Sequence, residues 1–272
     1  LWGEEVYYIG HLHQDLYGQR IIDEFAEAGV DTSQVVFSDD MITPLASVLV
    51  NRLTGSRTII TRKMQTPPSL TYDQKLKLDD LAERLIASEE PVTILIDGHE
   101  AEISEYLIKK LPHAKVVMDG GSLRASNIKL AAWTDYFVVS EHFARDYMSY
   151  RSLSTEADIK AALIELNKIC RGEAFITLGE KGCAFLKSGM LQIVPSWLCN
   201  AVDTTGAGDV FHGAFTYGVH YSWHIDNIIL FASLTAAISI EKKGVRESMP
   251  DLAVVHHSLN SYERNLKQYF EE

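Results

Sequence analysis

Residues 200–215 read NAVDTTGAGDVFHGAF, a stretch with two closely spaced glycines, then an aspartate, then a largely apolar run. Gly206 and Gly208 let the backbone come close to a ligand. The apolar run predicts a buried helix whose first backbone amides face whatever lies before it, and an anion such as a phosphate fits there. Because Asp209 would be a poor ligand beside that anion, we expect it to take a proton from a hydroxyl that attacks the phosphate.

The short Gly-x-Gly-Asp string also has a simpler interpretation. It is consistent with a tight loop in which Asp209 is only a carboxylate favoured by the dipole at a helix start. Three positions further on, His212 lies between Phe211 and Phe215 and is interpreted as a packing histidine. The short string alone therefore leaves both uses of Asp209 open.

The fold class follows from short apolar runs, rich in β-branched residues, that alternate with helical patterns. Such alternation indicates βαβ units and a largely parallel sheet, hence an α/β protein. One crossover helix is indicated by a capping start at Thr155, by apolar residues at helical spacing through Cys170, and by Gly172 as its stop. The clearest buried strands are expected at residues 92–96, 116–118, 136–139 and 174–178.

Residues 46–62 depart from this pattern. Two runs with β-branched residues, at 47–50 and 58–61, flank the sequence LTGS at 53–56, which is a hairpin signal. We expect an antiparallel appendage here, used either as a lid beside the parallel sheet or as an ordinary edge hairpin.

The composition argues against two classes of partner. With 25 lysines and arginines against 37 aspartates and glutamates, the formal charge of −12 would repel nucleic acid. No apolar run approaches the length that crosses a bilayer, so a membrane partner is not expected. The three cysteines, Cys170, Cys183 and Cys199, are widely spaced and form no CxxC pair, which favours a reduced, cytoplasmic setting.

The longer string from Asp203 to Phe215, Asp-Thr-Thr-Gly-Ala-Gly-Asp-x-Phe-x-Gly-Ala-Phe, resembles the C-terminal signature of the PfkB family, which includes ribokinase and ketohexokinase. Residues 9–18 and 28–32 resemble the family's early strand, its Asp-x-x-Gly helix entry and its Gly-Val-Asp-Thr turn. Residues 176–183 are similar to its Thr-Leu-Gly-x-x-Gly element. The resemblance implies a ribokinase-like three-layer α/β/α sandwich with a mostly parallel central sheet and a small β lid.

The same resemblance implies an ATP-dependent sugar kinase, which transfers the γ-phosphoryl group of Mg-ATP to a hydroxyl of a sugar or sugar derivative. Asp209 would be the general base, and the amides of Gly206, Ala207 and Gly208 would form the anion hole. The residues that it places against the nucleotide are Thr177, Gly179, Gly182, Gly206, Gly208 and Gly244.

Two kinds of metal ion follow from the resemblance. Mg²⁺ would bridge the β- and γ-phosphates. Family members often carry an Asn-x-x-Glu element that organises the magnesium shell, whereas this chain reads SEHF at 140–143. Glu141 would then act through water, or it is a solvated surface carboxylate. Asp203 and Thr205 match positions that help to hold a monovalent cation in many members, which allows activation by K⁺.

The acceptor side of the site rests on two loops. The sequences DGHE at 97–100 and DGGS at 119–122 each follow a predicted strand, where ligands gather in open α/β sheets. Gly98 and His99 are therefore candidate substrate contacts, although each loop is also consistent with a strand-to-helix turn capped by its aspartate. His11 and His13 are expected on a loop that borders the sugar pocket rather than on a metal.

We expect a single kinase domain over residues 1–272 that acts as a homodimer on a small-molecule sugar. The chain begins at Leu1 without a methionine, and from the resemblance we expect the family's first strand and helix to be missing from it. A nucleoside or vitamin-like alcohol kinase of the same fold and a non-catalytic, ligand-sensing relative stay as alternatives. A Rossmann dehydrogenase fits less well because the glycine motif comes late in the chain.

Overall fold

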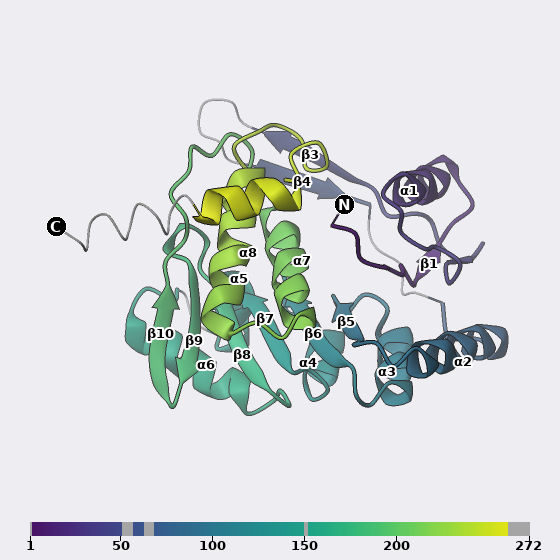
Figure 1. Ribbon diagram of the computed structural model, residues 1–272, viewed down its shortest axis with the longest axis horizontal. Coiled ribbons are helices and arrows are strands. Elements are labelled where there is room, and N and C mark those ends of the chain that lie inside the picture. The colour runs from purple at the N-terminus through teal and green to yellow at the C-terminus, as the bar shows by residue number, and fades with distance from the viewer. Residues whose placement is uncertain (1, 51–56, 63–67, 150–151, 261–272) are drawn as a thin grey trace. The chain divides into compact units, whose positions relative to one another are not determined.

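The computed structural model describes residues 2–50, 57–62, 68–149 and 152–260 (Figure 1). They form two compact units, one within Gly3–Glu83 and one that runs onward from Arg84 and includes Trp2. The boundary between the units falls inside α2 (Tyr72–Ala87). In the described part of the chain, no helix combines the length and the apolar character needed to span a bilayer.

The first unit contains a short parallel pair of strands and a helix. β1 (His11–Leu12) pairs with β2 (Val36–Phe37), and α1 (Leu16–Glu27) connects them. Asp15 is the N-cap of α1, and its Oδ1 accepts a hydrogen bond of 2.8 Å from the amide of Gly18. The Asp-x-x-Gly helix entry predicted from the sequence is therefore present, because the carboxylate satisfies an amide that has no acceptor within the helix.

The first unit also contains an antiparallel pair of strands. β3 (Ala46–Val50) lies beside β4 (Arg57–Thr61), with Ala46 opposite Thr61 and Val50 opposite Arg57. The antiparallel pairing expected within residues 46–62 is thus observed, while the predicted turn at 53–56 lies outside the described residues. The use of this pair as a lid stays a prediction.

The second unit is built on a six-stranded sheet in the order β10-β9-β8-β7-β6-β5. The strands from β5 to β8 are parallel, and β9 and β10 are antiparallel to their neighbours. The strands are β5 (Thr93–Ile96), β6 (Lys115–Gly120), β7 (Tyr136–Ser140), β8 (Glu173–Thr177), β9 (Cys183–Lys187) and β10 (Met190–Val194). Its helices include α3 (Ala101–Lys110), α4 (Ala125–Ala131), α5 (Glu141–Tyr147), α6 (Glu156–Asn167), α7 (Ala207–His220) and α8 (Ile225–Ser239).

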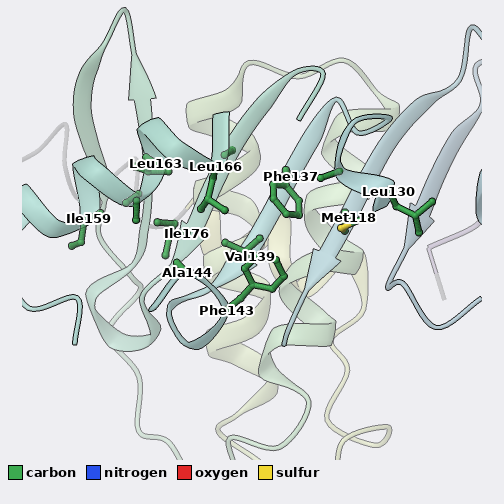
Figure 2. Close-up of a cluster of buried hydrophobic side chains, with 14 of the residues drawn as sticks. Met118, Leu130, Phe137, Val139, Phe143, Ala144, Ile159, Leu163, Leu166 and Ile176 are labelled. Atoms are coloured by element: carbon green, nitrogen blue, oxygen red, sulfur yellow. The ribbon is translucent and has the colours of Figure 1, made fainter. Parts of the chain in front are cut away.

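Helices cover both faces of this sheet, which makes three layers. Neighbouring side chains of β7 alternate between the faces: Phe137 and Val139 pack in one core with residues of α4, α5 and α6, and Val138 packs in another with residues of α7 and α8. Figure 2 shows the first of these cores. All three side chains have no exposed surface, and burying each stabilises the fold by roughly 1.5–3 kcal/mol. A strand buried on both faces reads as a continuous apolar run, which is why the sequence revealed it.

Two boundaries differ from the sequence-based expectation. β6 continues through Gly120, so Asp119 lies in the strand and not in the loop after it. α6 begins with the predicted cap at Thr155 but ends at Asn167, so Cys170 lies beyond the helix. Gly172 is not the helix stop, because its amide donates to the carbonyl of Thr134 and a Cβ there would overlap the carbonyl of Asp135. Close backbone approach, and not helix termination, requires glycine at this position.

A two-residue turn joins β9 to β10. Ser188 and Gly189 both have positive φ, 52° and 76°, as the tight turn of a twisted hairpin requires. Cys183 at the start of β9 lies opposite Thr177 at the carboxyl end of β8. The turn at the far end of β9 therefore lies toward the amino ends of the parallel strands.

Candidate active site

α7 begins at the glycine pair, as the sequence predicts. Its N-cap is Gly206, with a φ of 74° in the left-handed region that glycine adopts without steric cost. A Cβ on Gly206 would also overlap Cγ1 of Val245, so both the backbone conformation and the available space require glycine. The first-turn amides have no acceptor within the helix and can bind an anion, although that of Ala207 lies 3.4 Å from the carbonyl of Thr204.

The loop before α7 is tied to the segment after α8 through Asp203. Its Oδ1 accepts a hydrogen bond of 3.0 Å from the amide of Thr205, and its Oδ2 accepts one of 3.3 Å from the amide of Gly244. The amides of Val202 and Asp203 both donate to the carbonyl of Ile240, at 2.7 and 3.1 Å. Three residues that the sequence assigned to a cation and to the nucleotide are therefore neighbours.

Asp209 lies in the first turn of α7, where the sequence places it. Desolvation by the surrounding protein raises the pKa of its carboxyl, the charge of Asp119 raises it further and that of Asp97 adds to this, while His212 lowers it. Asp209 is nevertheless exposed to solvent at the start of the helix. A reachable carboxylate that is more basic than an ordinary aspartate has the two properties of a general base.

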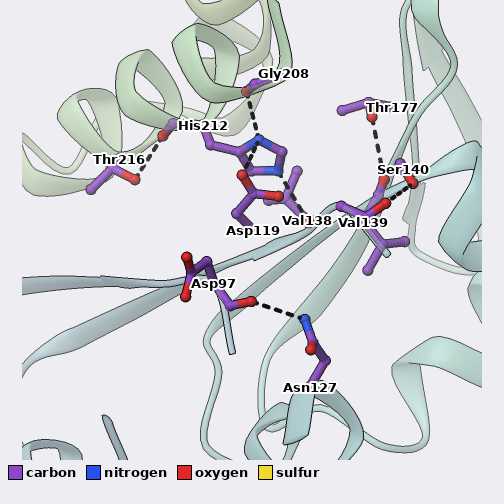
Figure 3. Close-up of polar contacts among 11 residues, drawn as sticks. Asp97, Asp119, Asn127, Val138, Val139, Ser140, Thr177, Gly208, His212 and Thr216 are labelled. Atoms are coloured by element: carbon purple, nitrogen blue, oxygen red, sulfur yellow. Dashed lines mark hydrogen bonds and ion pairs between the residues drawn. The ribbon is translucent and has the colours of Figure 1, made fainter. Parts of the chain in front are cut away.

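His212 is buried beneath the start of α7 with polar partners from two strands (Figure 3). Its Nδ1 lies 2.7 Å from the carbonyl oxygen of Gly208 and 3.4 Å from Oδ2 of Asp119, and its Nε2 lies 3.2 Å from the carbonyl oxygen of Val138. The interpretation as a packing histidine is therefore incomplete. The available signal was its position three residues after Asp209, which puts both side chains on one side of a helix.

The Asp97 loop forms a tight turn that a buried asparagine supports. Oδ1 of Asp97 accepts a hydrogen bond of 2.9 Å from the amide of His99, and Gly98 has a φ of 79°. Asn127, fully buried on α4, donates from Nδ2 to the carbonyl of Asp97 at 3.3 Å (Figure 3). A Cβ on Gly98 would come within 2.5 Å of Oδ1 of Asn127. The turn is thus present, Asn127 was missed by the sequence, and substrate contact by Gly98 and His99 stays a prediction.

The segment after β8 is a short 3₁₀ helix (Gly179–Lys181). The chain then returns through Gly182, whose φ is 103° and where a Cβ would overlap the carbonyl of Val194. The amide of Leu178 donates to the carbonyl of Gly182 at 2.7 Å, which closes the turn. This compact, glycine-bearing element lies directly after Thr177, the last residue of β8.

Glu141 is the first residue of α5 and is partly buried. Ser140 before it caps the helix by accepting a hydrogen bond of 3.0 Å from the amide of Phe143, and its hydroxyl donates to the carbonyl of Gly121 at 2.9 Å. Within the described ranges, no group of three or more histidines, cysteines, aspartates or glutamates could hold a metal ion. Glu141 is therefore a single carboxylate and not one corner of a preformed metal cage.

The register of the parallel strands brings these loops to one edge of the sheet. Gly120 lies opposite Val139, and Ser140 lies opposite Thr177, so the carboxyl ends of β6, β7 and β8 are neighbours. The start of α7 joins this edge through the contact between His212 and Asp119. Ligands bind at such edges in open α/β sheets.

The two histidines near the start of the chain belong to the first unit. His11 is buried and its Nε2 contacts the side-chain amide of Gln74, and Nδ1 of His13 lies 3.0 Å from the carbonyl oxygen of Ser38. The two histidines therefore have different partners. The contact between His11 and Gln74 is buried and helps to hold the first unit together.

The comparison with known protein families gives a match to the pfkB family carbohydrate kinases over residues 1–252. The chain belongs to this family. A ribokinase from Lactococcus lactis is 28% identical over 262 residues, which cover 96% of this chain and 82% of that protein. Fructokinase-2 from Oryza sativa is 24% identical over 279 residues, with 93% of this chain and 79% of that protein covered.

A solved ribokinase structure shows the same fold. Arabidopsis thaliana ribokinase, in complex with ribose and ATP, superposes with a TM-score of 0.75 at 21% identity, covering 93% of this chain and 81% of that chain. The predicted family and the ribokinase-like α/β fold are therefore confirmed, and so is the enzyme class, a phosphotransferase of the carbohydrate kinase type. The roles of individual residues stay predictions.

Proposed function

We propose that this chain transfers the γ-phosphoryl group of ATP to a hydroxyl of a sugar or sugar derivative, with Asp209 as the general base. The observation that carries the proposal is the position of Asp209 in the first turn of α7, directly after the Gly206 cap, with the pKa of its carboxyl raised. The names of the relatives support a sugar acceptor, since they include a ribokinase and a fructokinase.

In the proposed step, the acceptor hydroxyl gives its proton to the Asp209 carboxylate while its oxygen forms a bond to the γ-phosphorus. The bond between the γ-phosphorus and the oxygen that bridges to the β-phosphate breaks, and ADP leaves with that electron pair. The amides of Gly206, Ala207 and Gly208 would stabilise the charge on the transferred group. Such amides are fixed by the helix, so they need no reorganisation during the reaction.

The nucleotide would lie along the glycine-bearing segments at the same edge. Gly179 and Gly182 allow close approach after Thr177, and Gly244 is held beside the α7 loop by Asp203. Glycines that already adopt positive φ suit a phosphate or a base that packs directly on the backbone. The choice of ATP as the nucleotide is supported by the ATP in the Arabidopsis thaliana ribokinase complex.

Two ions fit the donors that are present. A single carboxylate such as Glu141 suits Mg²⁺, which keeps much of its water and is bound largely through substrate phosphates. When bound there, it would neutralise charge on the phosphates. The carboxylate of Asp203, which accepts hydrogen bonds from the amides of Thr205 and Gly244, and the hydroxyl of Thr205 are the oxygen ligands that would hold K⁺.

The acceptor sugar would lie near the Asp97 loop, in reach of the backbone at Gly98 and of His99. Asn127 holds the carbonyl of Asp97, so this loop presents a fixed surface to the acceptor. A rigid loop favours one orientation of the attacking hydroxyl over others.

The test is ADP release with Mg-ATP across a panel of aldopentoses, keto sugars, sugar acids and nucleosides, for the parent and for Asp209→Asn. The matched control is Asp226→Asn, because Asp226 is also a first-turn aspartate, on α8, where it pairs with Lys187 at 2.9 Å. Acceptor-dependent turnover should fall about a hundredfold or more in Asp209→Asn and stay near the parent rate in Asp226→Asn.

Equal turnover in the parent and in Asp209→Asn would refute the role of Asp209. Binding of ATP without turnover on any acceptor would favour a ligand-sensing relative. Turnover with nucleosides alone would keep the chemistry and replace the sugar as acceptor.

A further inference from the structure

Each ring nitrogen of His212 lies close to oxygen atoms of the protein. Nδ1 lies 2.7 Å from the carbonyl oxygen of Gly208 and 3.4 Å from Oδ2 of Asp119, and Nε2 lies 3.2 Å from the carbonyl oxygen of Val138 (Figure 3). The residue is 3% exposed, so water cannot separate the ring from these partners. The environment of both nitrogens is therefore set by protein oxygens.

These partners decide how many protons the ring carries. A backbone carbonyl can only accept a hydrogen bond, and a neutral imidazole has one donor nitrogen and one acceptor nitrogen. Either neutral tautomer would direct a lone pair at a carbonyl oxygen. Only the doubly protonated ring donates to Gly208 and to Val138 at once, with the Asp119 carboxylate beside it to balance the charge.

The charges around the start of α7 are mostly negative. Asp119 comes from β6, Asp97 follows β5, and Asp209 lies on α7 itself, so the charges of two carboxylates act on a third at this sheet edge. Their repulsion favours protonation of the proposed base, which would disable it. The effect of His212 on Asp209 has the opposite sign.

We propose that His212 is a buried imidazolium that keeps Asp209 ionised and holds the peptide between Gly208 and Asp209 in place. The carbonyl of this peptide accepts the hydrogen bond from Nδ1, and its amide is one of the first-turn amides at the anion site. A charged donor on the carbonyl polarises the peptide and strengthens its N–H as a donor to an anion. The part that concerns catalysis rests on the proposed function, whereas the charge of the ring does not.

His212 is thus a positioning residue, because it acts through Asp209 and through a backbone peptide. The first experiment needs no substrate: nitrogen NMR at neutral pH of the chain labelled with ¹⁵N-histidine, which reports whether each ring nitrogen carries a proton. Two protonated ring nitrogens are expected for His212 in the folded parent, and one of them should lose its proton in Asp119→Asn at the same pH. One unprotonated nitrogen of His212 in the folded parent would overturn the proposal, even if the kinase is fully active.

The second experiment follows kcat/KM against pH for the parent, His212→Asn and the double variant His212→Asn with Asp119→Asn. Loss of the positive charge should move the acid limb of the profile upward by about one to two pH units, and removal of the Asp119 charge should move it back. His220→Gln is the control, since His220 also lies on α7 and contacts Thr93. A lower rate with an unmoved acid limb would mean that His212 only supports the fold, and the proposal would be wrong.

Discussion

Replacing Gly206 by alanine tests whether the start of α7 depends on one backbone conformation. Gly206 has a φ of 74°, and an L-residue in the left-handed region costs roughly 1–2 kcal/mol. The added Cβ would also overlap Cγ1 of Val245, and overpacking costs roughly 1–3 kcal/mol. Because Val245 is only partly buried and can move, we expect a loss of about 2–3 kcal/mol in the free energy of unfolding.

The assay is urea unfolding followed by circular dichroism, with two further variants that separate the causes. In a chain that already carries Val245→Ala, the added Cβ at residue 206 meets no overlap. There, Gly206→Ala should lower the free energy of unfolding only by the cost of the backbone conformation, roughly 1–2 kcal/mol. Gly213→Ala is the matched control, because Gly213 lies inside α7 with nothing within 4 Å of an added Cβ. It should stabilise the chain by up to about 1 kcal/mol. A midpoint for Gly206→Ala equal to that of the parent would refute the reasoning.

Two further predictions concern ionisation. Burial raises the pKa of the Asp209 carboxyl, so the folded chain binds this proton more tightly than the unfolded chain does. The free energy of unfolding therefore falls as pH rises from the ordinary carboxyl range through the raised pKa. Asp209→Asn should therefore have a higher melting temperature than the parent at neutral pH, and the difference in melting temperature should disappear at acid pH. A lower melting temperature of the variant at neutral pH would contradict this. Burial also raises the pKa of Cys183 to about 12 and that of Cys170 to about 11, so neither should react with iodoacetamide at mildly alkaline pH until the chain unfolds. Mass spectrometry of the labelled peptides measures this, and rapid labelling of Cys183 in the folded chain would show that it is not buried.

The parts of the fold that the sequence predicted are those with local causes. The apolar run of β7 indicates a strand because every one of its central residues is buried, and the cap at Thr155 lies within three residues of its partner Asp158. The helix start at Gly206 was predictable for the same reason, since the conformation that requires glycine is set over a few residues.

The parts that the sequence missed depend on distant neighbours. His212 meets Val138 across a separation of 74 residues, and Asn127 meets Asp97 across a separation of 30. No sequence pattern within a few residues indicates either contact. The interpretation of His212 therefore rested only on the two phenylalanines near it in the sequence. Gly172 was misread as a helix stop for the same reason, because the carbonyl that excludes a side chain there belongs to Asp135.

The turn between β9 and β10 provides a place to attach the chain to a surface. Ser188 and Gly189 are exposed, and the turn lies toward the amino ends of the parallel strands, whereas the candidate site lies at their carboxyl ends. Nothing lies within 4 Å of an added Cβ at Gly189. A short tag or a linker inserted between these two residues would hold the second unit by the edge of its sheet that faces away from Asp209. When the chain is immobilised in this way, the carboxyl ends of the parallel strands, where the proposed chemistry takes place, would face the solution and its substrates.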